Sequence, residues 1–221
     1  MSVLLAALRK EALLQWRTRA QFVAIFVFGA AALLLFSFAI GPDSGALRQH
    51  AAGFLWLGLL LASTLTLAET FQSEMEQRAL EVLLLLPVPP AALFYAKAIS
   101  NWAQLTVLGI GLVPVMVVLY DAGTHRVPAL IGVIILGTAA LSAPGTLYAA
   151  MTSQARARQT LLPLLLFPLV VPVLLASVKA SSLLITGDPM GQMGSWAILL
   201  ACFNAIYWSV CGLLFGRVVE D

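Results

Sequence analysis

The sequence predicts an all-α polytopic membrane protein with six transmembrane helices. Of its 221 residues, 61% are hydrophobic and only 10% are charged, whereas soluble domains carry about 25% charged residues. A span needs about 20 mostly apolar residues, and six stretches qualify: 22–40, 51–68, 98–120, 128–151, 161–178 and 196–216. The segments between them are too short for a soluble domain, so residues 1–221 are expected to form one polytopic transmembrane domain.

The distribution of Lys and Arg predicts that both termini are cytoplasmic. With the N-terminus inside, the inner segments hold Arg9, Lys10, Arg17, Arg19, Arg78, Lys97, Arg156, Arg158 and Arg217. The outer loops hold only Arg48, Arg126 and Lys179. Basic residues concentrate on the cytoplasmic side of multi-pass proteins. The net charge of +2 therefore reflects topology and predicts no nucleic-acid partner.

Residues 1–19 precede the first span and are expected to form a helix along the inner membrane surface. One face collects Leu5, Leu8, Ala12 and Trp16, and Lys10 and Arg17 lie away from it. Two interpretations stay open: a basic topology signal, or a surface helix with a function.

The polar interruption at 69–97 is the feature that most clearly indicates a partner. On a helical wheel its charged face holds Glu74, Gln77, Arg78 and Glu81. The opposite face holds Met75, Ala79, Val82, Leu83 and Leu86, and Pro87, Pro89 and Pro90 then end the helix. This pattern favours a cytoplasmic helix on which a soluble motor protein docks. The alternative is an ordinary amphipathic surface loop.

The sequence contains no energy source of its own. It lacks a G-x-x-x-x-G-K-[ST] phosphate loop, and no Asp, Glu, Lys, Arg or His falls inside the six stretches, where ion-coupled transporters usually keep one. Catalytic and metal-binding constellations are absent, so we expect neither an enzyme nor a resident cofactor. His50 and His125 are weak ligand candidates, and Cys202 and Cys211, on opposite faces of one helix, are expected to be apolar fillers.

Polar and proline residues inside the spans are expected to serve packing or motion. Asn101, Gln104 and Asn204 should stabilise helix contacts, and the small residues 142–145 should form a packing notch. Three prolines, Pro163, Pro168 and Pro172, interrupt the fifth span. They predict either a hinge or kinked packing without a specific role.

Several local strings carry a resemblance to a known family. The main run contains Phe71, Leu80-Glu81, Leu83, Leu86-Pro87, Ala96-Lys97 and Trp102. Supporting strings are Gly41-Pro42, Ala143-Pro144-Gly145, and Pro168-Leu169 with Pro172. Together with the length and the six spans, they resemble the CcmB-type haem exporter protein B permeases of cytochrome c maturation. The chain departs from the family at Arg78-Ala79, where a Gly often precedes the Leu-Glu pair.

The resemblance implies an ABC-2-like permease subunit of the bacterial inner membrane. It implies a separate ATPase subunit, CcmA, which would bind ATP, the membrane proteins CcmC and CcmD, and indirectly the haem chaperone CcmE, with haem as a candidate cargo. The implied role is haem delivery or release of the loaded chaperone. Because six spans are few for a pathway, we expect two copies in the complex. The alternatives are an ABC-2-type exporter of a lipid, glycan or drug, and a membrane scaffold without transport.

Overall fold

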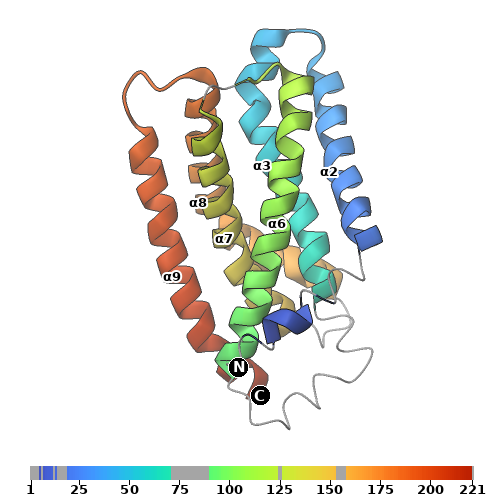
Figure 1. Cartoon of the computed structure of the whole chain (residues 1–221), viewed down its shortest axis with the longest axis vertical. Coiled ribbons are helices and arrows are strands. Elements are labelled where there is room, and N and C mark those ends of the chain that lie inside the picture. The colour runs from blue at the N-terminus through green and yellow to red at the C-terminus, as the bar shows by residue number, and fades with distance from the viewer. Residues whose placement is uncertain are drawn as a thin grey trace.

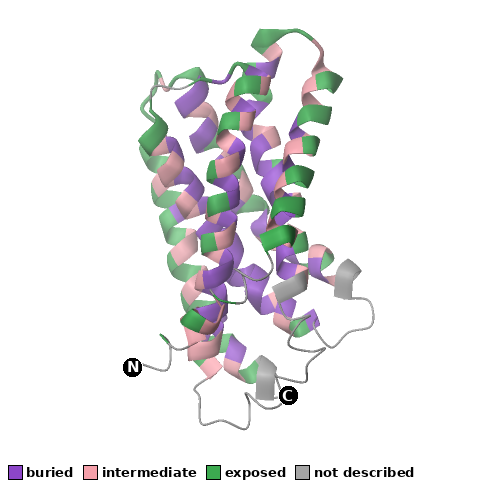
Figure 2. Ribbon diagram, turned by 45° about the vertical axis from the view of Figure 1, so that its right-hand side comes forward, coloured by how far each residue is buried: buried purple, intermediate pink, exposed green. Residues whose placement is uncertain are grey.

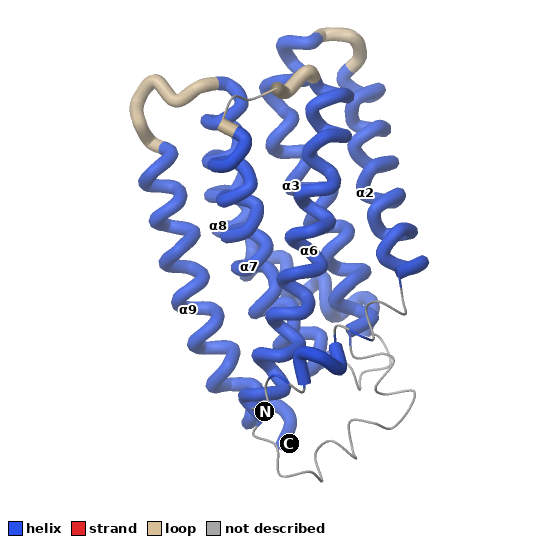
Figure 3. Tube along the Cα trace, viewed as in Figure 1, coloured by secondary structure: helices blue, strands red, loops and turns tan. Residues whose placement is uncertain are grey.

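A computed structural model describes residues 5, 7–11, 13, 19–70, 90–123, 126–152 and 158–220 of the chain. In these ranges all regular structure is α-helical (Figure 3). Six long helices form a bundle: α2 (Arg19–Ile40), α3 (Ser44–Thr70), α6 (Pro90–Tyr120), α7 (Val127–Thr152), α8 (Arg158–Thr186) and α9 (Met193–Glu220). Each is long and apolar enough to cross a bilayer, which confirms the predicted fold class.

The bundle places both chain termini at one end (Figure 1). The α2–α3 and α8–α9 connections lie at the other end, as an even number of spans requires. We call the end with the termini the inner end, because the basic residues predict that it faces the cytoplasm. Helix α7 is central and packs against α3, α6, α8 and α9, whereas the main contacts of α2 are with α3 and α6.

The exposed surface of the bundle is the kind expected in a bilayer and not in water. Residues 137–147 of α7 are all buried, but α2 buries only Ile25, Gly29 and Leu33 (Figure 2). The exposed side chains of the outer helices are mostly apolar; Val118 of α6 and Leu213 of α9 are about four-fifths exposed. Hydrocarbon surrounds such faces at little cost, and the helices satisfy their own backbone groups.

The helices extend beyond the apolar stretches from which they were predicted. Residues 44–50 and 179–186, expected in outer loops, belong to α3 and α8. Asp43 explains the early start of α3, because its Oδ1 accepts hydrogen bonds from the backbone N–H groups of Gly45 (2.9 Å) and Ala46 (3.2 Å). Gly187, with φ of 106°, ends α8 by the positive φ that glycine tolerates.

Asp188 caps α9 in the same way at the outer end. Its two carboxylate oxygens each accept a 2.9 Å hydrogen bond, from the backbone N–H groups of Gln192 and Met193. The hydrogen bond from Met193, followed by that from Gln192, lowers the pKa of Asp188 below its ordinary value. The predicted outer loop is therefore reduced to a short capped turn.

The small residues of α7 allow other helices to approach closely. Ser142, Pro144 and Gly145 are buried, and a Cβ added at Gly145 would overlap the side chain of Leu67 in α3. The hydroxyl of Ser142 donates a 2.6 Å hydrogen bond to the carbonyl oxygen of Ala98 in α6. The predicted packing notch is confirmed.

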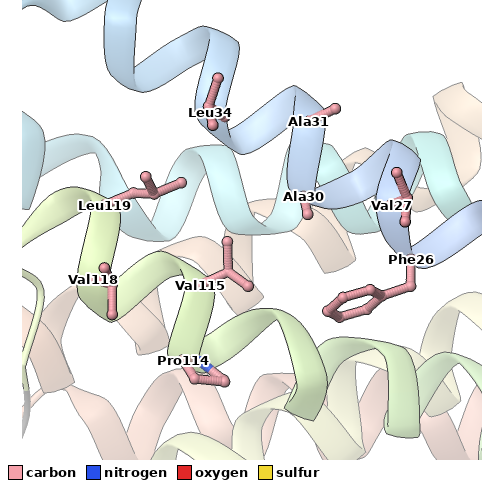
Figure 4. A pocket seen from close by; sticks show the side chains of 9 residues that line it. All are labelled: Phe26, Val27, Ala30, Ala31, Leu34, Pro114, Val115, Val118 and Leu119. Carbon is pink, nitrogen blue, oxygen red and sulfur yellow. The ribbon is translucent and has the colours of Figure 1, made fainter. Parts of the chain in front are cut away.

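A shallow groove of about 580 Å³ runs between α2 and α6 on the outside of the bundle. All nine lining residues are apolar; Phe26 and Ala30 come from α2, and Pro114 and Val115 from α6 (Figure 4). This groove lies on a lipid-facing side of the bundle and contains no group that would orient a polar molecule.

Candidate functional site

The inner end of α6 holds a buried ion pair with the N-terminal segment. Lys97 lies seven residues after Pro90, the first residue of α6, and its Nζ is 3.4 Å from Oε1 of Glu11. The two side chains are only 6% and 13% exposed. Figure 1 shows the dark blue N-terminal segment beside the lower end of α6. The described residues of this segment are helical, as predicted, and Glu11 connects them to the bundle.

The predicted apolar face of the N-terminal segment does not account for this contact. Leu5, assigned to that face, is 57% exposed, whereas Leu8 is half-buried. The carboxylate of Glu11 makes the contact with α6. Ala12 and Trp16 lie outside the described residues.

The predicted docking residues Glu74, Gln77, Arg78 and Glu81 lie outside the described residues. The helices that flank them are described: α3 ends at Thr70 and α6 begins at Pro90, both at the inner end (Figure 1). A proline suits the first position of a helix, where its missing N–H would have no helical partner. Residues 71–89 therefore join the inner ends of α3 and α6.

Helices α6 and α7 are joined by polar side chains inside the bundle. Asn101 Nδ2 donates a 2.9 Å hydrogen bond to Thr146 Oγ1, and the hydroxyls of Thr106 and Thr138 are 2.8 Å apart. Both bonds hide polar groups that would be costly to leave unpaired in hydrocarbon. The prediction that Asn101 stabilises a helix contact is confirmed.

Backbone carbonyls in the middle of α7 accept three further side-chain hydrogen bonds, one from α6 and two from α9. They join Trp102 Nε1 to Ile135 O (3.0 Å), Asn204 Nδ2 to Leu136 O (2.9 Å) and Trp208 Nε1 to Ala139 O (3.1 Å). A helical carbonyl has a second lone pair, so it can accept these donors without losing its own helix bond. The result is a group of three helices, α6, α7 and α9, held together by directional contacts. The prediction for Asn204 is confirmed, whereas the two indole contacts were not foreseen.

Helix α8 is fastened to different partners along its length. Near its outer end, Ser181 Oγ accepts a 2.9 Å hydrogen bond from Trp56 Nε1 of α3. Further inward, the carbonyl oxygen of Leu169 accepts a 2.9 Å hydrogen bond from the Tyr207 hydroxyl of α9. Leu169 lies three residues before Pro172, whose missing N–H leaves the neighbouring carbonyl of Pro168 without its helical donor. A side chain of α9 thus binds a carbonyl beside the break.

The described cysteine and histidine side chains lie in surroundings that suit helix packing. Cys202 is exposed and Cys211 is buried, on opposite sides of α9 as their spacing predicts. His50 Nδ1 is 2.8 Å from the carbonyl oxygen of Ala46, one turn earlier in α3, and His125 is not among the described residues. In the described ranges no three His, Cys, Asp or Glu residues gather in a way that could hold a metal ion. The described contacts fasten helices to one another.

Comparison with known proteins identifies the family. The family model described as "CcmB protein" matches residues 2–215 of the chain. The chain belongs to the CcmB family. The resemblance drawn from the local strings is thereby confirmed, and the six apolar helices make this CcmB family member a multi-pass membrane protein.

Two relatives of this CcmB-family chain match over most of their length. "Heme exporter protein B" of Pseudomonas aeruginosa is 32% identical over 189 residues, which cover 86% of this chain and 85% of that protein. "Heme exporter protein B" of Bradyrhizobium diazoefficiens is 30% identical over 201 residues, covering 91% and 90%. A relative with the same name in Rhodobacter capsulatus is 36% identical over 141 residues, covering 64% and 65%.

Proposed function

We propose that this chain is the membrane permease subunit of an ABC transporter complex that acts in c-type cytochrome biogenesis. The observation that carries the proposal is the match of the CcmB family model to residues 2–215, supported by relatives named heme exporter protein B. ATP hydrolysis would take place in a separate ATPase subunit, CcmA, so the chain itself is a transporter component and not an enzyme. The complex would lie in the bacterial inner membrane and include CcmC and CcmD.

The arrangement of the helices supports a route for the coupling. The partner ATPase would press on the segment between Thr70 and Pro90, through the charged face formed by Glu74, Gln77, Arg78 and Glu81. A displacement of α6 would carry α7 and α9 with it, because hydrogen bonds from Asn101 and Trp102 join α6 to α7, and others join α9 to α7. The polar interruption at 69–97 would then be the part of the permease that receives the motion of the ATPase.

The prolines of α8 would let this helix bend when α6, α7 and α9 are displaced. Pro163, Pro168 and Pro172 each remove a backbone donor within one helix. The outer part of α8 is fastened to α3 and its middle to α9, so a relative motion of α3 and α9 would have to be absorbed between Leu169 and Ser181. This supports a hinge near Pro172.

The function is tested by deleting the gene in its host and restoring it on a plasmid. The proposal expects haem-stained c-type cytochromes to disappear on deletion and to return with the wild-type gene. They should not return when the partner ATPase carries a substitution that abolishes hydrolysis. Intact cytochromes in the deletion strain would overturn the proposal in favour of an exporter of another cargo. Recovery with the inactive ATPase would favour a scaffold without transport.

The same strains separate the two forms of the proposed role. If the complex delivers haem, the inactive ATPase leaves the chaperone CcmE without haem. If the complex releases the loaded chaperone, haem-loaded CcmE accumulates instead. Haem staining of CcmE in membranes reads out the difference directly.

Docking of the ATPase is tested with single cysteines placed in a chain that carries Cys202→Ser and Cys211→Ala. Cysteines replacing Glu74, Gln77, Arg78 or Glu81 should crosslink to cysteines on the ATPase surface. A cysteine replacing Met190, which is 80% exposed at the outer end, is the matched control and should give no product. No crosslink from any of the four positions in an active complex would refute the docking face.

A further inference from the structure

The ion pair between Lys97 and Glu11 is buried far more than most contacts between charged side chains. The Lys97 side chain is 6% exposed and that of Glu11 13%. Lysine and glutamate are almost never so buried unless an opposite charge compensates them. The two residues are 86 positions apart in the sequence, so the pair connects separate parts of the chain.

Lys97 occupies a core-facing position of α6. The residues that share its helix face, Phe94, Asn101 and Leu105, are all buried. Lys97 lies 23 residues before Tyr120, the last residue of α6, which corresponds to about 35 Å along the helix. The hydrocarbon core is only about 30 Å thick, so with Tyr120 at the outer boundary the Lys97 ammonium group would reach the inner boundary, where protein covers it.

A second lysine on the same carboxylate provides an internal comparison. Lys10 Nζ is 3.9 Å from Glu11 Oε1, and the Lys10 side chain is 41% exposed. Pairs between exposed charges are screened by water and contribute little. Because Lys10 and Glu11 are neighbours in the N-terminal segment, their pair does not reach the bundle, whereas the Lys97–Glu11 pair joins the segment to α6.

We propose that the Lys97–Glu11 ion pair fixes the N-terminal segment to the inner end of α6, so that the two move as one body during the transport cycle. This makes Lys97 and Glu11 positioning residues for the coupling, and the inference rests on the proposed function. It also favours one of the two interpretations of residues 1–19, that of a surface helix with a function, because Glu11 of this segment contacts α6. Through α6, its position is tied to α7 and α9.

The placement is tested first, by a measurement that does not require transport. In a chain with Cys202→Ser and Cys211→Ala, a cysteine replaces half-buried Leu8 or exposed Leu13. A water-soluble maleimide is applied to inside-out membrane vesicles. The Leu8 position should label slowly in the parent and several-fold faster with Lys97→Met, and slowly again in the charge swap Lys97→Glu/Glu11→Lys. The Leu13 position should label at one rate throughout. A Leu8 rate unaffected by Lys97→Met would overturn the placement.

The coupling is tested by the amount of mature c-type cytochrome formed per permease present in the membrane. Lys97→Met and Glu11→Gln should each reduce this ratio several-fold, whereas Lys97→Arg and the charge swap should recover most of it. Lys10→Gln is the matched control and should leave the ratio unchanged. A role in stability alone would lower the amount of permease and leave the ratio intact, which would refute the positioning role.

The two tests keep the inference separate from the proposed function. If deletion of the gene leaves c-type cytochromes intact, the proposed function fails, but the labelling of Leu8 still decides whether the ion pair places the segment. If Lys97→Met does not accumulate, Glu11→Gln provides the same comparison, because it removes the charge and keeps the shape of the side chain. A wild-type ratio and wild-type labelling in Glu11→Gln would refute the inference.

Discussion

The indole Nε1 of Trp56 donates a 2.9 Å hydrogen bond to Oγ of Ser181 and thereby joins α3 to α8 inside the bundle. Trp56 is fully buried, and the edge of its ring lies against Gly137 of α7. One side chain of α3 thus contacts two other helices, by a hydrogen bond to one and by close packing on the other.

Replacing Gly137 with alanine is expected to destabilise the protein. The added Cβ would overlap the ring of Trp56 and lie 2.7 Å from Oγ of Ser177, and overpacking of this kind costs about 1–3 kcal/mol. The melting temperature in detergent should fall accordingly. Gly132→Ala, in the same helix but with no neighbouring atom within 4 Å, is the control. Equal melting temperatures for the two variants would contradict the tight contact.

The hydrogen bond between Asn101 and Thr146 should appear as a coupling energy. A double-mutant cycle of Asn101→Ala and Thr146→Val is expected to give about 0.6 kcal/mol, the average for such bonds in membranes, and at most about 1.7 kcal/mol. Chemical unfolding in detergent measures it. Thr64, whose hydroxyl bonds to Leu61 of its own helix, supplies the control: Thr64→Val and Asn101→Ala should be additive. Additivity in both cycles would argue against an energetic contribution from the bond.

Pro172→Ala should preserve the protein and impair its activity. Alanine restores the backbone donor in the middle of α8, so the amount of protein in the membrane should not fall. If the proposed hinge lies at Pro172, the substitution stiffens it, and the yield of c-type cytochrome per permease should fall several-fold. Pro128→Ala is the control, since Pro128 is the second residue of α7, where proline disturbs no helical bond. A full yield from Pro172→Ala would leave kinked packing as the explanation of that proline.

The cap of α9 should make a part of the stability depend on pH. Backbone hydrogen bonds lower the pKa of Asp188 below 3.8, so ionised Asp188 favours the folded state. Its contribution is complete above pH 3.8 and disappears as the pH falls through the lower pKa of the folded protein. The melting temperature of wild type should exceed that of Asp188→Asn at neutral pH, and the difference should shrink in acid. A difference that is independent of pH would contradict the role of the charge.

The six spans could be predicted because each is a continuous apolar run, and in a bilayer such a run has few alternatives to a helix. The ends of the helices were harder to place. Residues 44–50 and 179–186 look polar enough for loops, but Asp43 caps the first group, and the second continues α8 up to Gly187. Hydropathy indicates which residues prefer lipid to water. It does not mark the end of a helix, because a helix can extend into water when its terminal backbone groups are capped.

The interior contacts divide into those that residue type predicts and those that it does not. An amide inside a span, such as Asn101, has to find a polar partner, so its role was predictable even though Thr146 was not. Lys97 looked like a charge at the membrane boundary, and nothing in the local pattern indicates that Glu11, 86 residues away, neutralises it. Such pairs depend on how the helices pack in three dimensions, and the hydrophobic periodicity of the sequence does not predict this.

The length of α6 has a consequence for the membrane around it. With 31 residues it spans about 46 Å, well beyond the hydrophobic thickness of about 30 Å. A bilayer thicker than the apolar part of α6 would draw the Lys97 ammonium group toward the lipid tails. The match between the length of α6 and the thickness of the bilayer is therefore expected to affect the ion pair at the inner end of the bundle.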